Sequence, residues 1–195
     1  EKHLIEDFLY AQEFLPIQHM PWKNISLPDF PINVALPDIP ESKKNYLANR
    51  MTDSYGFVTM GEEDRLEYSK EHRKTDTLSG IIYFVQHGVF DRYLKVDNDF
   101  HRDSLYAERL KVWEKNESMD ISISQTDKVE IEGIEGYQYL GELEKSHMKF
   151  RLQVLIKGRH LVEHYAFLPP SEVDHPHVDS FFQNISIKEL NAPWS

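Results

Sequence analysis

The chain has 195 residues, and its 33 acidic side chains outnumber its 22 lysines and arginines, which gives a formal net charge of −11. A composition that is 40% hydrophobic and 12% aromatic is too apolar for general disorder and is typical of a folded domain. The acidic balance repels phosphate backbones, so we expect no nucleic-acid binding. The absence of cysteine excludes disulfides, thiolate nucleophiles and zinc–thiolate sites.

The beginning of the chain is predicted to form an arm, residues 1–28, in front of a single domain, residues 29–195. A helical spacing of apolar side chains predicts an amphipathic helix over residues 4–14, formed by Leu4, Ile5, Phe8 and Leu9. More than half of the prolines lie between Pro16 and Pro40, and proline resists both helices and central strands. We therefore expect an extended arm with one edge strand over residues 30–36.

Strand signals dominate the next region of the chain, after a weak short helix over residues 41–51. The β-rich stretch 54–60 runs into a turn, GEED, and residues 65–72 are expected to form the returning strand. Residues 79–90 predict a strong strand, because the apolar run from Ile81 to Val85 indicates burial on both faces of a sheet.

The longest predicted helix covers residues 98–117. Tyr106, Leu110 and Trp113 lie at helical spacing, and Asp99 or Asp103 is expected to cap the start of the helix. Two short strands with alternating apolar and polar residues follow, over 119–124 and 128–134.

An antiparallel meander is predicted for residues 136–170. Its second strand alternates with period two, and the Lys157-Gly158-Arg159 sequence is a tight-turn signal because glycine accepts positive φ. A C-terminal helix and a short last strand over 184–190 follow, with an apolar stripe of Val178, Phe181, Phe182 and Ile185. The predicted fold class is α+β, a central antiparallel sheet with helices packed on it.

The sequence DHPHVD places two histidines and two aspartates around Pro176, and it has two interpretations. Proline is favoured in the first turn of a helix, so Asp174 or His175 falls at the cap, and acidic residues early in the helix face its positive end. A metal site would use Asp174, His175, His177 and Asp179, but at least three ligands must converge on one point. The cap is the favoured interpretation, with His177 on the solvent side and no bound metal.

A second histidine pair, His160 and His164, lies on a predicted strand. At about 3.3 Å per residue the two are about 13 Å apart and cannot share one ion, so we expect partly buried, hydrogen-bonded histidines. The chain contains no P-loop, GxGxxG or GxSxG motif, and we expect no cofactor.

Three segments in this order resemble the PsbP-like superfamily. They are FPINVALPDIP, an early strand beside proline; VLIKGRHLVEHYAFLPP, the end of the meander; and VDSFFQNISI, a helix that leads into a last strand. The resemblance covers residues 28–190 and implies an α+β fold. Members of that superfamily are mostly accessory or binding subunits, so the resemblance also implies a binding role without catalysis. It carries over no catalytic residue.

Three functional hypotheses follow from these observations. The first is a non-enzymatic binding or accessory domain of a bacterial envelope protein, with another protein as its partner and membrane attachment only through a segment outside this chain. The second is a soluble acidic interaction protein, such as one that neutralises a toxin, which the net charge favours. The third is a metal-dependent hydrolase built from scattered histidines and acids. We expect a periplasmic or envelope location rather than a cytoplasmic one.

Overall fold

The computed structural model describes residues 22–26, 32–37, 51–57, 66–77, 79–91, 99–115, 119–174 and 176–187. The helix predicted over 4–14, most of the short helix predicted over 41–51 and the GEED turn lie outside these described residues.

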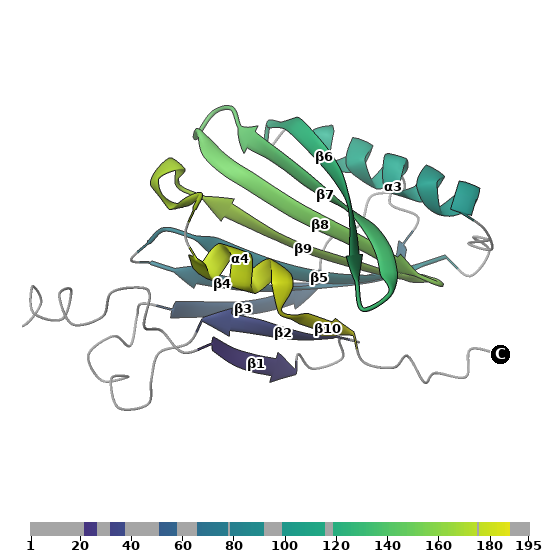
Figure 1. Ribbon diagram of the computed structural model, residues 1–195, viewed down its shortest axis with the longest axis horizontal. Helices are drawn as coiled ribbons and strands as arrows, with labels where there is room; N and C mark the ends of the chain where they lie inside the picture. Colours follow the sequence, from purple (N-terminus) through teal and green to yellow (C-terminus); the bar gives the residue numbers. More distant parts are fainter. Residues whose placement is uncertain are drawn as a thin grey trace, which may run out of the picture.

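The main structural element is a seven-stranded sheet in which all neighbouring strands are antiparallel (Figure 1). Its order is β3-β4-β5-β9-β8-β7-β6. This confirms the predicted meander, formed by β7, β8 and β9, and β6 extends it by one strand. The strands are β3 (Met51–Phe57), β4 (Leu66–Asp76), β5 (Ile82–Phe90), β6 (Ile121–Ile131), β7 (Ile134–Leu143), β8 (Met148–Lys157) and β9 (His160–Leu168).

Helix α3 (Asp99–Glu114) covers one face of this sheet, and its position confirms the predicted helix. The helix already begins at Asp99, so Asp103 lies inside it and cannot be the cap. The apolar cluster beneath α3 combines Leu105, Tyr106 and Trp113 of the helix with alternate residues of the sheet, including Phe84, Phe150, Leu152, Leu161, Tyr165 and Phe167.

The opposite face of the sheet packs against helix α4 (Pro176–Gln183), which follows the short 3-10 helix η4 (Pro170–Glu172). A second sheet lies beside α4, with strand order β1-β2-β10. Its strands are β1 (Trp22–Ser26), β2 (Ile32–Pro37) and β10 (Ile185–Ile187). The apolar cluster on this face joins Val34 and Leu36 to Tyr83, Val162, Val178, Phe181, Phe182 and Ile185.

The prediction of a single edge strand in the proline-rich region was wrong. Strand β2 is the middle strand of the small sheet and pairs with both β1 and β10, and β1 itself was not predicted. The reason is the placement of the prolines: they fall at the end of β2 and outside it, so the amides of residues 32–36 remain able to pair on both sides.

The two short strands predicted over 119–124 and 128–134 merge into a single strand, β6, which ends at Ile131. Its register with β7 shifts between Ile123 and Gln125, as in a β-bulge. A bulge inserts one extra residue and shifts the alternation by one position, so the sequence pattern breaks although the pairing continues.

The α+β description holds in a strand-rich form: the described residues contain two α-helices and ten strands. Burial of β5 on both faces is also confirmed. Its consecutive residues Phe84 and Val85 belong to the apolar clusters on the α3 face and the α4 face respectively. Two apolar layers therefore hold the sheet between α3 on one side and α4 with the small sheet on the other.

Candidate functional site

A groove of about 640 Å³ opens on the α4 face of the large sheet, beside the beginning of α4 and the outer strands. One wall is formed by α4 and the turn that precedes it, and the floor is formed by β6, β7, β8 and the end of β9. The lining residues are Ser122, Ser124, Leu140, Gly141, Glu142, Lys149, Phe150, Arg151, Leu168, Val173, Asp174, Val178 and Asp179.

The strand register explains why these side chains meet. Directly opposed residues of neighbouring strands point to the same face of a sheet. Ser122 pairs with Glu142, Glu142 with Lys149, and Lys149 with Leu168, so these four form one row across the floor. Residues that are up to 46 positions apart in the chain therefore line one side of the groove.

Two ion pairs lie in the groove, one within its floor and one between its floor and its wall. In the first, the Lys149 ammonium group contacts the Glu142 carboxylate, which also lies 3.2 Å from Nδ1 of His147. The hydrogen bond from Lys149, followed by that from His147, lowers the pKa of Glu142 below its usual value. Glu142 is therefore ionised at neutral pH and already compensated.

Arg151 forms the second ion pair and connects α4 to the sheet. Its Nη1 donates to Oδ1 of Asp179 at 2.8 Å, and its Nε donates to Oε1 of Gln138 at 3.0 Å. The guanidinium carbon lies 4.2 Å from the centre of the Phe182 ring, which is close enough for a cation–π interaction. These contacts hold the wall of the groove in place against its floor.

The structure does not bring the described residues of the possible metal site together around one point. Asp174 is exposed at the rim of the groove, and Asp179 is exposed and paired with Arg151. His175 lies outside the described residues. Pro176 begins α4, in the predicted first-turn position. Among the described residues, no group of three or more histidines and acids is arranged to hold a metal ion.

The prediction that His177 faces solvent was wrong. The side chain is only 4% exposed, because α4 begins at Pro176 and a residue four positions before Phe181 lies on the same helix face. That face packs on the sheet, so the position of His177 follows from where the helix begins.

His164 is also more buried than the sequence suggested. It is 0% exposed, with the rings of Phe181 and Phe182 at 5.7 and 5.2 Å. Burial, assisted by the charge of Arg151, lowers its pKa to about 3. The Phe182 backbone opposes this shift, but neither ring nitrogen has a partner at hydrogen-bond geometry among the described residues. The expectation of a partly buried, hydrogen-bonded histidine was therefore wrong here.

His160 agrees with that expectation. It is half-buried, and its Nδ1 lies 3.1 Å from Nε2 of His87. Burial lowers the pKa of both rings. The pKa of His87 falls to about 4, with further contributions from His160 and Lys70, and the pKa of His160 is lowered further by the charge of Arg159. His160 and His164 lie in separate environments and do not form one site.

A buried ion pair on the α3 face was not predicted. Glu163 is 0% exposed and accepts hydrogen bonds from Nε and Nη2 of Arg109, at 3.0 and 2.8 Å, and from Nε1 of Trp113, at 3.1 Å. One sequence feature could have indicated this site: Arg109 and Trp113 are four residues apart, so on one helix their side chains lie on the same face. The bidentate pair between Arg109 and Glu163 fixes α3 on β9. Together with the Trp113 bond, it gives both carboxylate oxygens a hydrogen-bond donor.

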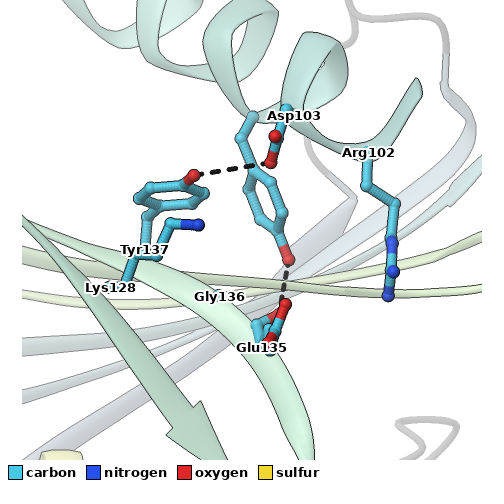
Figure 2. Close-up of a pocket in the computed structure, with 7 residues that line it drawn as sticks. Arg102, Asp103, Lys128, Glu135, Gly136 and Tyr137 are labelled. Atoms are coloured by element: carbon cyan, nitrogen blue, oxygen red, sulfur yellow. Dashed lines mark hydrogen bonds between the residues drawn. The ribbon is translucent and has the colours of Figure 1, made fainter. Parts of the chain in front are cut away.

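A small cavity of about 20 Å³ lies between the start of α3 and the β6–β7 hairpin (Figure 2). The Tyr106 hydroxyl donates to the Glu135 carbonyl at 2.8 Å and accepts from the amide of Ile156 at 3.0 Å. The Tyr137 hydroxyl donates to Asp103 at 3.4 Å. A volume of this size holds about one water molecule, so this cavity is too small for a larger ligand.

The arrangement of the two sheets and two helices described above is a PsbP-like fold. The solution structure of cyanobacterial PsbP (CyanoP) from Synechocystis is similar with a TM-score of 0.56, over 85% of this chain and 92% of that chain, at 8% sequence identity. No family model and no curated protein matches the sequence. The resemblance inferred from the order of the elements is thus confirmed for the fold, and at this identity the likeness concerns the fold alone.

Proposed function

We propose that this chain is a non-enzymatic accessory domain that binds a protein partner through the groove between α4 and strands β6–β8. The observation that carries the proposal is the groove itself: it is open, its wall is held by Arg151, and its lining contains both apolar and charged groups. Such a mixture is typical of protein-recognition surfaces. The PsbP-like fold supports the proposal by analogy with accessory subunits.

The charge pattern supports binding rather than catalysis. A general acid or base needs a pKa close to the working pH and contact with the substrate. In the groove, Lys149 and Arg151 are engaged in ion pairs, and the pKa of Glu142 is lowered rather than raised. His164 has a strongly shifted pKa, but it is fully enclosed and cannot meet a substrate.

The proposed setting is the bacterial envelope, by analogy with PsbP-like lipoproteins, and the partner is another protein there. Within the residues that the structure describes, no helix is both long enough and apolar enough to cross a bilayer. The net charge of −11 also favours the second candidate, a domain that neutralises a basic protein. The identity of the captured partner distinguishes the two.

The test is site-specific photo-cross-linking in cells of the source organism. A photoreactive amino acid replaces Ser122 on the floor of the groove or, as a control, Glu132 in the exposed β6–β7 turn. We expect a discrete adduct from position 122 and none from position 132, with the partner identified by mass spectrometry. Equal adducts from both positions, or adducts from position 132 alone, would contradict the groove as the binding site.

A further inference from the structure

We propose that the groove takes an extended peptide segment that carries a basic side chain beside an apolar one and that runs along the edge strand β6. This inference rests on the proposed function and specifies the chemistry of the partner. It follows from three separate features: the exposed edge of β6, the charge balance of the groove and the apolar rim at Val173.

The edge strand makes an extended ligand the best fit. Strand β6 is at the end of the large sheet, and among the described residues its outer side pairs with no other strand. An edge strand offers unpaired amide and carbonyl groups to an incoming strand. Ser122 and Ser124 of this strand line the groove, so the groove opens at the sheet edge and its occupant can reach both.

The distribution of charge along β6 indicates which half of the strand is available. Charged side chains protect exposed edges against unwanted pairing. Asp127, Lys128 and Glu130 lie in the second half of β6, whereas residues 121–126 carry no charge. The uncharged half is the one that borders the groove. Because the bulge between Ile123 and Gln125 interrupts this half, pairing is expected beside the bulge and not along the charged half of the strand.

The charge balance of the groove favours a basic side chain in the ligand. Its lining contains three acids and two bases, and each base is engaged with an acid: Lys149 with Glu142, and Arg151 with Asp179. Asp174 is exposed at the rim and has no ion pair within the described residues of the chain. Among the described residues of the lining, one carboxylate is therefore not compensated and favours a cation in the ligand, in a chain whose net charge is −11.

The apolar requirement comes from the residue next to Asp174. Val173 is 42% exposed, which makes it an exposed large hydrophobic side chain at the mouth of the groove. Leu140 and Val178 extend the apolar surface inward. A ligand that places an apolar side chain against Val173 and a basic one against Asp174 satisfies both neighbours at once.

The experiment uses three synthetic peptides of equal length, each labelled with fluorescein, and measures their binding to the full chain by fluorescence anisotropy. The first peptide carries valine and lysine in turn at every second position, with serine between them, so that both side chains point to the same face of the extended chain. The second peptide has glutamate in place of lysine, and the third is the valine–lysine peptide with its alternate amides N-methylated on one edge. We expect only the first peptide to bind. Asp174→Lys is expected to weaken this binding about tenfold or more.

The matched control is Glu114→Lys, which makes the same change of charge at an exposed position on α3, on the other face of the sheet. It is expected to change the affinity less than about twofold. Equal binding of the valine–glutamate peptide, an unchanged affinity in Asp174→Lys, or equal losses in both variants would overturn the proposed charge recognition. Unchanged binding of the N-methylated peptide would overturn the pairing with β6.

The variant Ser122→Trp separates this inference from the proposed function, because it fills the floor of the groove at an exposed position. For this comparison the photoreactive residue replaces Ser124, which also lines the groove. If Ser122→Trp abolishes the cellular adduct but the valine–lysine peptide does not bind wild-type protein, the groove binds a partner of different chemistry. The inference about the peptide is then wrong, while the proposed function stands. If the adduct persists in Ser122→Trp, the groove is not the binding site and both proposals fail.

Discussion

The enclosure of His164 predicts that the protein loses stability in mild acid. The ring is fully buried between β9 and α4, where Phe181 and Phe182 cover it. Among the described residues, the polar groups near it include the Arg151 guanidinium, the Phe182 backbone and the Gln153 amide of β8, and His72 lies two strands away in the same cross-strand row. None of these groups is an acid that could stabilise a protonated ring.

The size of the effect follows from the lowered pKa of His164, about 3 in the folded protein against an ordinary value of 6.5. Above pH 6.5 the ring is neutral in both states and contributes no pH dependence. As the pH falls below 6.5, only the unfolded chain takes up the proton, so the free energy of unfolding falls by at most about 1.4 kcal/mol per pH unit. Between pH 6.5 and about pH 4 the loss is on the order of 3 kcal/mol.

The assay is urea unfolding of the wild type and of His164→Leu, each at about pH 7 and about pH 4.5. Leucine has a similar volume and cannot titrate, so the variant should lose about 2 kcal/mol less stability on acidification than the wild type does. Val173→Leu is the control, because it changes an exposed side chain that cannot titrate; its pH dependence should match the wild type. Parallel pH dependences in the wild type and His164→Leu would refute the enclosure of this ring.

Four further predictions concern the packing of the domain and the absence of a metal. Phe181→Ala should lower the free energy of unfolding by about 3–5 kcal/mol through the cavity it creates. His177→Ala should lower the same free energy by at least about 1 kcal/mol, because that side chain is also buried. The exposed control Val173→Ala should change the free energy of unfolding by less than about 0.5 kcal/mol. Glu163→Gln should cost about 3–5 kcal/mol, because Arg109 loses its buried carboxylate; a neutral result in urea unfolding would show that the pair does not hold α3. Removal of residues 1–28 deletes β1 but should leave a cooperative thermal transition, because β2 keeps its pairing with β10; a lost transition would place the arm within the domain. Calorimetric titration of tag-free protein with Zn²⁺ should show no stoichiometric site, and a tight site abolished by His175→Ala or His177→Ala would restore the metal interpretation of DHPHVD.

Local patterns predicted most of the elements correctly. Period-two alternation identified β8, the glycine at position 158 marked its turn with β9, and helical spacing identified α3 and α4. These signals work because the periodicity of a helix or strand is a property of a few consecutive residues. The predicted element boundaries were wrong where a local irregularity breaks the pattern, as at the bulge in β6. In the proline-rich region, the middle strand of the small sheet was predicted to be an edge strand.

The sequence by itself determined the class of the fold, the order of most of its elements and the acidity of the chain, because these depend on composition and on short-range spacing. Only the tertiary structure decided which polar residues are enclosed and which remain available. Glu163 is paired with a helix residue 54 positions earlier, and Arg151 holds Asp179 from across the groove. Burial and charge compensation depend on such distant contacts, which no local pattern records. For this reason the groove became visible only in the folded chain, together with Asp174, the carboxylate of its lining that forms no ion pair among the described residues.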